Sequence, residues 1–371
     1  MIVKLGSLIS EYSVRNKADE NIPVYSVTNE QGFCTGYFSK EVASQDRTTY
    51  KIVPRGCFAY NPSRINVGSV DVQECEDRVI VSPLYVVFSV DEKLNRRYLL
   101  HYLKSDITLT YIKAYASGSV RDNLKFSILK DFPINLPSAE EQEQIVATLD
   151  GIEHLIALRK EELASLDELV KSRFIELFES GNYPVCRLGD VCSKITDGTH
   201  KTPNYLDAGV TFISAKNIVN GELDFSDVKY ISDQEYAEIQ KRCQTEMGDI
   251  LLSKSGSLGA PVIVKTTERI GLFESLAVIK YDRSKLLPAF LCEQLKSDRI
   301  QRQFKVGTKG VAIKHLHLGV IADTDIVVPP IEDQNAFAAF VEQTDKSKLA
   351  VQKALEELEI LKKSLMQQYF G

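Results

Sequence analysis

The clearest pattern in the chain is a run of apolar residues that follows Pro137, with spacings that alternate between four and three. This spacing places the apolar side chains on one stripe of a helix and is typical of a coiled-coil seam. Arg159 and Arg173 occupy the two empty places of the repeat. The pattern predicts a long heptad helix over residues 137–180, with a seam formed by Ile145, Leu149, Ile152, Ile156, Leu163, Leu166, Val170 and Leu177.

A second, weaker seam follows Pro329 and predicts another long helix over residues 329–371. Lys348 and Lys362 interrupt it. A proline in the first turn costs no hydrogen bond, and early acidic residues suit the helix dipole, so both prolines with their EEQ or EDQ sequences are good helix starts. The seam of the second helix is formed by Phe337, Val341, Val351, Leu355, Leu358 and Leu365.

The two helices belong to a longer internal repeat. Residues 98–178 align without a gap with residues 290–370, at an offset of 192 positions. YLLHYLKSD in the first copy matches FLCEQLKSD in the second, and LPSAEEQ matches VPPIEDQ. Two units of this size indicate a duplication, because a solenoid needs several short repeats.

Two interpretations of the helices remain open. Each could be a surface helix packed on its own domain. Alternatively, the two seams bury each other, which avoids an apolar stripe in water. We favour pairing, in antiparallel orientation, because a duplicated chain that closes with pseudo-twofold symmetry runs its equivalent helices in opposite directions. About 33 helical residues at 1.5 Å each would give a spacer of roughly 50 Å.

The remaining segments, residues 1–136 and 181–328, read as two globular mixed α/β domains. Segments rich in β-branched residues predict strands, and longer periodic segments predict helices. The expected strands are 79–90, 209–214, 262–265 and 276–281, and the expected helices are 98–115 and 289–304. The fold class is therefore mixed α/β, with two globular domains and two long helices that pair as an antiparallel coiled coil.

The net charge of −6 is unevenly distributed. Residues 1–130 and 186–322 carry +3 each, whereas residues 131–185 carry −8 and residues 323–371 carry −4. Only the two basic blocks are plausible faces for nucleic acid. The sequence lacks a signal-peptide pattern and an apolar run of membrane-spanning length, which favours a cytoplasmic protein.

No catalytic motif is recognisable. The chain lacks a P-loop, a dinucleotide-binding glycine motif and the [DN]PP[YF] motif of amino-methyltransferases. Its seven cysteines form no CxxC pair, and His315 and His317 have no matching acidic cluster, so we expect no metal site and no cofactor in this chain. The sequence predicts a protein that is not an enzyme.

Polar loops in the basic blocks hold three clusters of candidate DNA-contacting residues in each unit. Short polar and cationic side chains read base edges, while lysines and arginines on phosphates set position. The structural alternative is that these residues cap turns or are simply solvated. The first unit contributes Asn29, Gln31, Tyr60, Asn61, Ser63, Arg64, Asn66, Ser119, Arg121, Asn123 and Lys125. The second unit contributes Lys216, Asn217, Ser253, Lys254, Ser255, Ser257, Lys309, Lys314 and His315.

This arrangement resembles the specificity subunits of type I restriction-modification systems. The residues that carry the resemblance are Leu5-Gly6 and Leu188-Gly189, Gly56 and Gly248–Leu251, Pro137–Gln142 and Pro329–Gln334, and the leucine-rich tails that end in Phe178 and Phe370. The resemblance covers essentially the whole chain. The first unit departs from it where RGCFAYNPS stands in place of GDILLSKSG.

The resemblance implies a division into a target recognition domain at 1–136, a central conserved helix at 137–180, a second target recognition domain at 181–328 and a C-terminal conserved helix at 329–371. Each recognition domain would read one half of a bipartite site in double-stranded DNA, and the helices would set the spacing. Two methyltransferase subunits, which carry S-adenosylmethionine, would dock on the chain, and two restriction and translocation subunits would complete the complex. Few loop residues are shared between the units, so we expect an asymmetric site.

Two other classes of function remain as alternatives. A protein-interaction scaffold without DNA contact would explain the acidic sum and the helices. An enzyme with an active site between the units would need titratable residues at equivalent repeat positions, whereas the matched residues are mostly leucine, glycine and helix-cap types.

Overall fold

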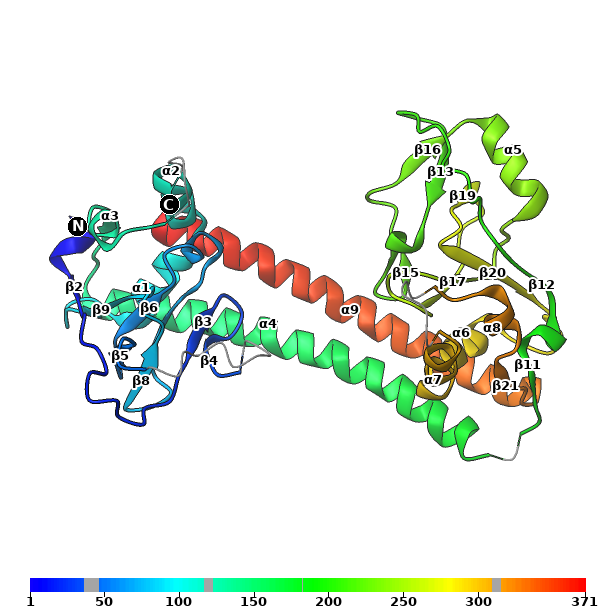
Figure 1. The fold of residues 1–371 in the computed structure, drawn as a ribbon, viewed down its shortest axis with the longest axis horizontal. Coiled ribbons are helices and arrows are strands. Elements are labelled where there is room, and N and C mark those ends of the chain that lie inside the picture. Colours follow the sequence, from blue (N-terminus) through cyan, green and yellow to red (C-terminus); the bar gives the residue numbers. More distant parts are fainter. Residues whose placement is uncertain (37–46, 117–122, 182, 309–314) are drawn as a thin grey trace. The chain divides into compact units, whose positions relative to one another are not determined.

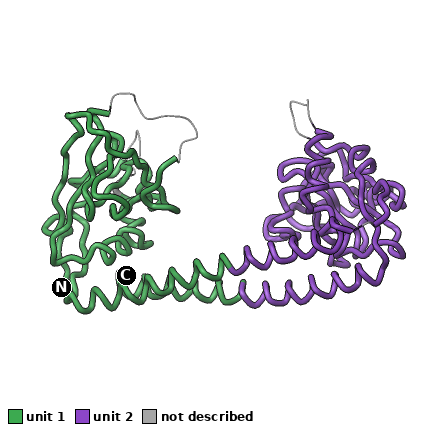
Figure 2. Tube along the Cα trace, turned by 90° about the horizontal axis from the view of Figure 1, so that it is seen from below, with its two compact units in different colours: residues 1–161, 352–371 green, residues 162–351 purple. Residues whose placement is uncertain are grey.

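The computed structural model describes residues 1–36, 47–116, 123–181, 183–308 and 315–371. The chain divides into two compact units, which Figure 2 distinguishes by colour. Unit 1 contains residues 1–161 and 352–371, and unit 2 contains residues 162–351. Each unit therefore includes part of both long helices.

Unit 1 begins with short strands and ends with three helices that precede the first long helix (Figure 1). Its strands are β1 (Ile2–Lys4), β2 (Ile9–Glu11), β3 (Ser26–Thr28), β4 (Gly32–Cys34), β5 (Lys51–Pro54), β6 (Phe58–Tyr60), β7 (Val70–Val72), β8 (Arg78–Val81), β9 (Val86–Val90) and β10 (Pro133–Asn135). Its short helices are α1 (Arg96–Lys104), α2 (Asp106–Ala116) and α3 (Phe126–Leu129).

The central sheet of unit 1 is antiparallel, with strand order β2-β9-β6-β7. β1 pairs with β10, so the start of the chain is joined to the segment just before the first long helix. The sheet buries its apolar face against α1, with Phe58 and Phe88 stacked at a ring distance of 5.1 Å. Burial of such aromatic side chains supplies most of the packing energy of a small core.

Unit 2 repeats this arrangement with additional strands. Its strands are β11 (Val185–Arg187), β12 (Cys192–Asp197), β13 (Val210–Ile213), β14 (Ile218–Val219), β15 (Glu222–Leu223), β16 (Lys229–Ile231), β17 (Ile250–Ser253), β18 (Pro261–Ile263), β19 (Ile270–Leu272), β20 (Leu276–Tyr281) and β21 (Asp325–Val327). Its helices are α5 (Asp233–Arg242), α6 (Pro288–Lys296), α7 (Asp298–Gly307) and α8 (Leu318–Ala322).

The central sheet of unit 2 is again four-stranded and antiparallel, in the order β12-β20-β17-β18. β11 pairs with β21 as β1 pairs with β10. A second sheet, in the order β16-β13-β19, has no counterpart of the same order in the described part of unit 1 and carries α5 against β19. The shared frame is thus the central sheet and the pairing of first and last strands, and each unit adds its own strands to this frame.

The long helices are α4 (Ala139–Phe174) and α9 (Ile331–Phe370). α4 continues into a π-helical turn, Ile175–Glu179. In unit 1 they run antiparallel, because Lys160 pairs with Glu359 at 3.4 Å and Glu153 pairs with Lys362 at 2.8 Å.

Antiparallel pairing also holds in unit 2. Lys348 Nζ lies 2.6 Å from Asp167 Oδ1, and the Phe174 ring lies 5.7 Å from the Phe337 ring. The predicted seam residues are all buried or half-buried. The fold is mixed α/β with a duplicated domain and antiparallel helix pairing, as predicted.

Three predicted elements are interrupted. The expected strand over 79–90 is two strands, β8 and β9, separated by a turn around Pro83. The expected helices 98–115 and 289–304 each break at a serine, Ser105 or Ser297, whose backbone is extended. The hydroxyl of each serine accepts a hydrogen bond from the amide three residues later, so it caps the following helix in place of continuing the preceding one.

The seven cysteines are all free thiols. Among the helices that the structure describes, none combines the length and the apolar character needed to cross a bilayer.

Candidate nucleic-acid interface

The three predicted contact clusters of unit 1 lie side by side. The Leu124 amide donates to the Pro62 carbonyl at 3.1 Å, which joins the segment 123–125 to the loop 61–68. At the end of that loop Gly68 has φ +85°, and a Cβ there would lie 2.4 Å from Asn29 Oδ1. Residues far apart in the sequence therefore form one polar surface.

Unit 2 joins its loops in the same way. The Leu316 amide donates to the Lys254 carbonyl at 2.9 Å, and these residues are the repeat equivalents of Leu124 and Pro62. Ser275 links the remaining cluster, because its hydroxyl accepts from the Ala215 amide and its carbonyl accepts from the Lys254 amide. The duplicated frame thus gathers equivalent loops at an equivalent place in each unit.

Most of the predicted contact residues that the structure describes are exposed or half-exposed. They are Asn29, Gln31, Asn61, Ser63, Arg64, Asn66, Asn123, Lys125, Lys216, Ser255, Ser257 and His315. Lys216 is paired with Asp227 at 2.9 Å, and the Asn61 side chain accepts from the Ser63 amide. The predicted residues Ser119, Arg121, Lys309 and Lys314 lie outside the described residues.

Four predicted contact residues are buried, and burial removes them from the candidate interface. Tyr60 is fully buried and its hydroxyl donates to the Leu124 carbonyl, so it supports the segment 123–125 from its buried side. Asn217 donates to the Asp224 and Asp227 carbonyls. Ser253 donates to the Ser255 carbonyl, and Lys254 is 2% exposed. These polar side chains shape the loops, which is the turn-capping role that the sequence left open.

A charged cluster that the sequence did not indicate surrounds Asp197, at the end of β12. Its side chain is 3% exposed and accepts from Lys254 Nζ at 2.5 Å and from Arg242. His200 Nε2 lies 3.3 Å from the same carboxylate. Burial alone would raise the pKa of Asp197, but the hydrogen bond and charge of Lys254 and the charge of Arg242 lower it below its ordinary value.

The cluster continues to Glu274. His200 Nδ1 lies 3.3 Å from Glu274 Oε2, and His315 Nε2 lies 4.0 Å from the same oxygen. Burial, with the charge of Lys254, lowers the pKa of His315, so this imidazole is neutral at neutral pH. The cluster therefore connects the loop after β12 with the predicted loops at Lys254 and His315.

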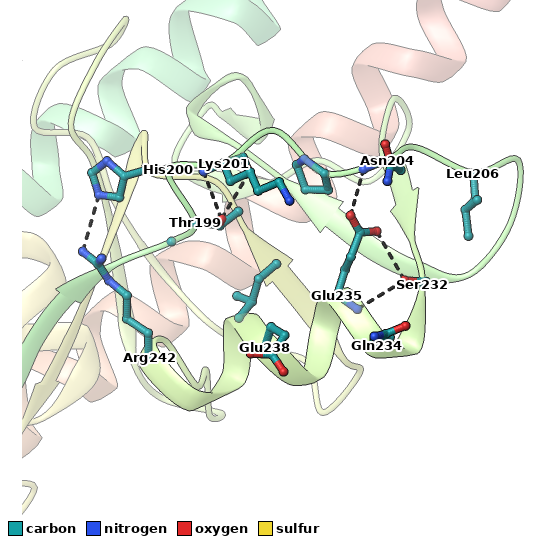
Figure 3. A pocket seen from close by; sticks show the side chains of 13 residues that line it. Thr199, His200, Lys201, Asn204, Leu206, Ser232, Gln234, Glu235, Glu238 and Arg242 are labelled. Carbon is teal, nitrogen blue, oxygen red and sulfur yellow. Dashed lines mark hydrogen bonds between the residues drawn. The ribbon is translucent and has the colours of Figure 1, made fainter.

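A pocket of about 680 Å³ opens beside this cluster, between the loop 198–206 and α5. Figure 3 shows His200 and Arg242 at one end of the pocket and Asn204, Glu235 and Ser232 at the other. The loop 198–206 packs closely against β19 at its start, because a Cβ on Gly198 would lie only 2.1 Å from the Leu272 carbonyl oxygen. Asp197, His200, Arg242 and Glu274 were missed in the sequence, although the polar turn-rich stretch 197–204 marks part of the site.

The helix starts are tied to the domains by two equivalent glutamines. The Gln142 amide donates to the Lys93 and Pro137 carbonyls and its oxygen accepts from the Asn95 amide. Gln334 makes the same three bonds, with Lys285, Pro329 and Leu287. Both side chains are buried, so the final glutamines of the EEQ and EDQ sequences orient the helices on their domains.

His101, Asp150 and Glu153 in unit 1 are close enough to hold a metal ion, with ligand atoms within 4.8 Å of one another. Arg97 donates to both oxygens of Asp150, and Lys362 pairs with Glu153. These cations already neutralise the carboxylates that an ion would need. The group is therefore best described as an ion-pair network that joins α1, α4 and α9 in unit 1.

Comparison with known proteins identifies the family of this chain. The family model for the type I restriction modification DNA specificity domain matches residues 6–168 and again residues 181–360. The chain belongs to this family and contains its domain twice, as a type I restriction-modification specificity subunit.

Curated relatives carry the corresponding names. The chain is 25% identical over 317 residues to the type I restriction enzyme EcoBI specificity subunit of Escherichia coli, covering 76% of this chain and 66% of that protein. It is 21% identical over 291 residues to the MjaVIII specificity subunit of Methanocaldococcus jannaschii, covering 72% and 68%. The chain thus spans about two thirds of the length of these relatives.

Solved structures share the fold. A chain from a study of complex assembly and conformational transition of the type I R-M system superposes with a TM-score of 0.62 at 18% identity, covering 100% of this chain and 97% of that chain. The type I restriction-modification S subunit from M. genitalium gives a TM-score of 0.54 at 15% identity, covering 100% and 96%.

Proposed function

We propose that each unit reads one half of a bipartite, asymmetric site in double-stranded DNA. The observation that carries this proposal is the equivalent placement of loops with different residues. The Leu124–Pro62 and Leu316–Lys254 hydrogen bonds hold the same two loops together in both units, yet the exposed side chains of those loops differ. A common frame with different polar residues is what two readers of different sequences require.

The experiment is methylome sequencing of cells that express the chain with its methyltransferase subunit, followed by binding of duplexes that carry the recovered site. We expect two short half-sites that differ in sequence and are separated by an unread gap. Binding that falls steeply with salt concentration supports direct phosphate contact. A palindromic or contiguous site would contradict the proposal, and salt-independent association without sequence preference would favour a protein scaffold.

The helices α4 and α9 set the distance between half-sites in this proposal. Insertion of seven residues after Glu161 and seven after Val351 preserves the heptad register and adds about 10 Å of helix, roughly three base pairs of B-DNA. The unread gap should lengthen by about that number while both half-sites stay the same. An unchanged gap would show that the helices do not act as the spacer.

The same helices are proposed to dock two methyltransferase subunits. Leu169 and Leu361 are equivalent in the repeat, and both are exposed, at 50% and 46%. Equivalent apolar positions suit two copies of one partner. Leu169→Glu together with Leu361→Glu should lower co-purification of the methyltransferase subunit, whereas the exposed polar pair Glu168→Gln and Glu357→Gln serves as the control.

The chemistry belongs to the partners in this proposal. The methyltransferase subunits would carry S-adenosylmethionine and modify adenine, and two restriction and translocation subunits would complete the assembly in the cytoplasm. The chain itself acts without a cofactor as a non-catalytic subunit. Purified chain alone should transfer no methyl group to its site, and addition of the methyltransferase subunit should restore transfer.

A further inference from the structure

The cluster at Asp197 contains more positive charge than its carboxylates require. Lys254 is as deeply buried as Asp197, and the two form a balanced pair at 2.5 Å. Arg242 then contacts the other oxygen of Asp197, and Lys201 stands on the same loop as His200. Leaving the imidazoles aside, the three cations Lys201, Arg242 and Lys254 outnumber the two carboxylates Asp197 and Glu274.

Part of this positive charge, that of Arg242, lies at one end of the pocket. The side chains of Arg242 and His200 are both 54% exposed, and both are oriented by the buried Asp197 carboxylate. Among the described residues, the contacts of the Arg242 guanidinium all involve Nη2. The rest of its planar fork is available to a ligand with several acceptor oxygens.

The acidic residues of the pocket do not oppose such a ligand. Glu235 accepts from the Asn204 amide and from Ser232, at the opposite end of the pocket (Figure 3). Glu238 is paired with Lys241 at 2.6 Å. Glu235 therefore lies away from the Arg242 end and the charge of Glu238 is offset, so Arg242 can make a charge-assisted contact with an anion there.

We propose that the Arg242 end of this pocket binds a backbone phosphodiester of the half-site read by unit 2. Arg242 and His200 are the contacting side chains, and the buried Asp197–Lys254 pair is the positioning element. The assignment rests on the proposed DNA-reading function and adds a contact site to it. A phosphate fits better than a base edge, because cations that are pre-oriented by a carboxylate match its charge and its several oxygens.

The site is specific to unit 2. The repeat places Pro62 of unit 1 at the position of Lys254, and proline supplies neither the charge nor the donor of the buried pair. The half-site read by unit 1 therefore serves as a control within the same DNA molecule.

The test compares Arg242→Gln with Lys241→Gln in the full chain assembled with its methyltransferase subunit. Both substitutions remove one positive charge from the last turn of α5, but Lys241 contacts only Glu238 among the described residues. For Arg242→Gln we expect roughly ten-fold weaker binding and a salt-dependence slope reduced by about one, equally for cognate duplexes and for duplexes altered in the second half-site. For Lys241→Gln we expect an unchanged slope and at most a small loss of affinity, because Glu238 in the pocket lining loses its cation.

A second variant tests the positioning role. Asp197→Asn keeps the shape of the side chain but removes the charge that orients Arg242, and it also leaves the buried Lys254 ammonium without its counter-charge. Stability should fall, and the folded fraction should show the reduced slope while specificity for the first half-site remains. Arg242→Lys retains the charge and should recover the slope in part. The slope is informative because a loss of folding alone would lower the active fraction without changing it.

The outcomes separate this inference from the proposed function. If the unaltered complex binds no bipartite duplex, the DNA-reading proposal fails. If it binds and Arg242→Gln behaves as Lys241→Gln does, only the phosphate site is overturned. Loss of affinity for the cognate second half-site alone, with an unchanged slope, would likewise overturn the phosphate assignment and point to base contact.

Discussion

Gln142 and Gln334 make the same three main-chain hydrogen bonds, one set in each unit. Each glutamine lies in the first turn of a long helix, α4 or α9. Its side chain reaches back to the segment just before α1 in unit 1 or just before α6 in unit 2. The amide group is the right side chain for this place, because it donates to two carbonyls and accepts from one amide at the same time. In each unit one buried glutamine therefore ties the first turn of the long helix to its domain through three hydrogen bonds.

Gln334→Leu should destabilise unit 2 by about 2–4 kcal/mol, because it leaves the Leu287 amide and the Lys285 and Pro329 carbonyls without their partner. The exposed Gln343→Leu on the same helix is the control. Thermal unfolding followed by calorimetry should show a midpoint lowered by several degrees for Gln334→Leu and nearly unchanged for Gln343→Leu. Equal unfolding midpoints for the two variants would contradict a stabilising role of Gln334.

The stability of the helix pair depends more on the apolar residues of the seam than on the lysines that interrupt it. Leu355 is 6% exposed, so Leu355→Ala should cost about 2–4 kcal/mol, whereas Leu361→Ala at an exposed position should cost much less. Lys348→Met removes two partly exposed ion pairs, with Asp167 and Asp345, and should change stability by no more than about 1 kcal/mol. Urea unfolding monitored by the helical circular dichroism signal measures all three, and a Lys348→Met cost as large as that of Leu355→Ala would refute this ranking.

The loop after β12 tolerates no side chain at Gly198. A Cβ there would lie 2.1 Å from the Leu272 carbonyl oxygen, which is main chain and cannot rotate away. Gly198→Ala should lower stability by about 2 kcal/mol or more and weaken DNA binding by displacing His200. Gly319→Ala is the matched control, because no described atom lies within 4 Å of its added Cβ. Comparable thermal midpoints for the two variants would contradict the predicted clash.

Unit 1 should lose stability in mild acid through His101. Burial lowers the pKa of His101 more than Glu153 and Asp150 raise it, and Arg97 also lowers it. The folded state therefore binds this proton less readily than the unfolded state, so stability falls as pH drops through the ordinary histidine pKa of about 6.5.

His101→Gln should flatten this dependence between about pH 7 and pH 5. The groups that face His101 are Asp150 and Glu153 on α4, with Arg97 on α1 and Lys362 on α9 as their partners. Asp150, whose pKa is lowered, contributes its own loss only at lower pH, below its ordinary value. Unfolding midpoints across this pH range, with His154→Gln at an exposed position as control, measure the effect; equal slopes for all proteins would exclude His101 as the cause.

The sequence predicted the fold class because its signals are local or repeated. Heptad spacing indicated the helices, and the alignment of LPSAEEQ with VPPIEDQ indicated the duplication. The end of the first seam was less visible: Phe174 and Phe178 are both buried, but each lies one position after a place of the heptad repeat, Arg173 or Leu177, and a π-helical turn spans Ile175–Glu179. Spacing rules assume a regular helix, so they fail where the helix changes its pitch.

The candidate interface was predictable only in part, because burial depends on partners that are distant in the sequence. Lys254 has the appearance of a surface lysine in a polar loop, and its carboxylate partner Asp197 is 57 positions earlier. Tyr60 likewise appears polar and exposed until its hydroxyl is seen to donate to Leu124, 64 positions later. Local composition indicated polar segments near both residues but could not tell which side chains face outward.

The aromatic ends of the long helices bear on the order in which the protein folds. Phe178 packs on Phe290 within unit 2, and Phe370 packs on Tyr98 and Tyr102 within unit 1. Unit 2 is continuous in sequence, whereas unit 1 needs residues 352–371, which the ribosome makes after all of unit 2. During synthesis unit 1 cannot complete its aromatic core until residues 352–371 have been made, whereas unit 2 can fold before that. This is the reverse of the usual order, in which the N-terminal unit folds first.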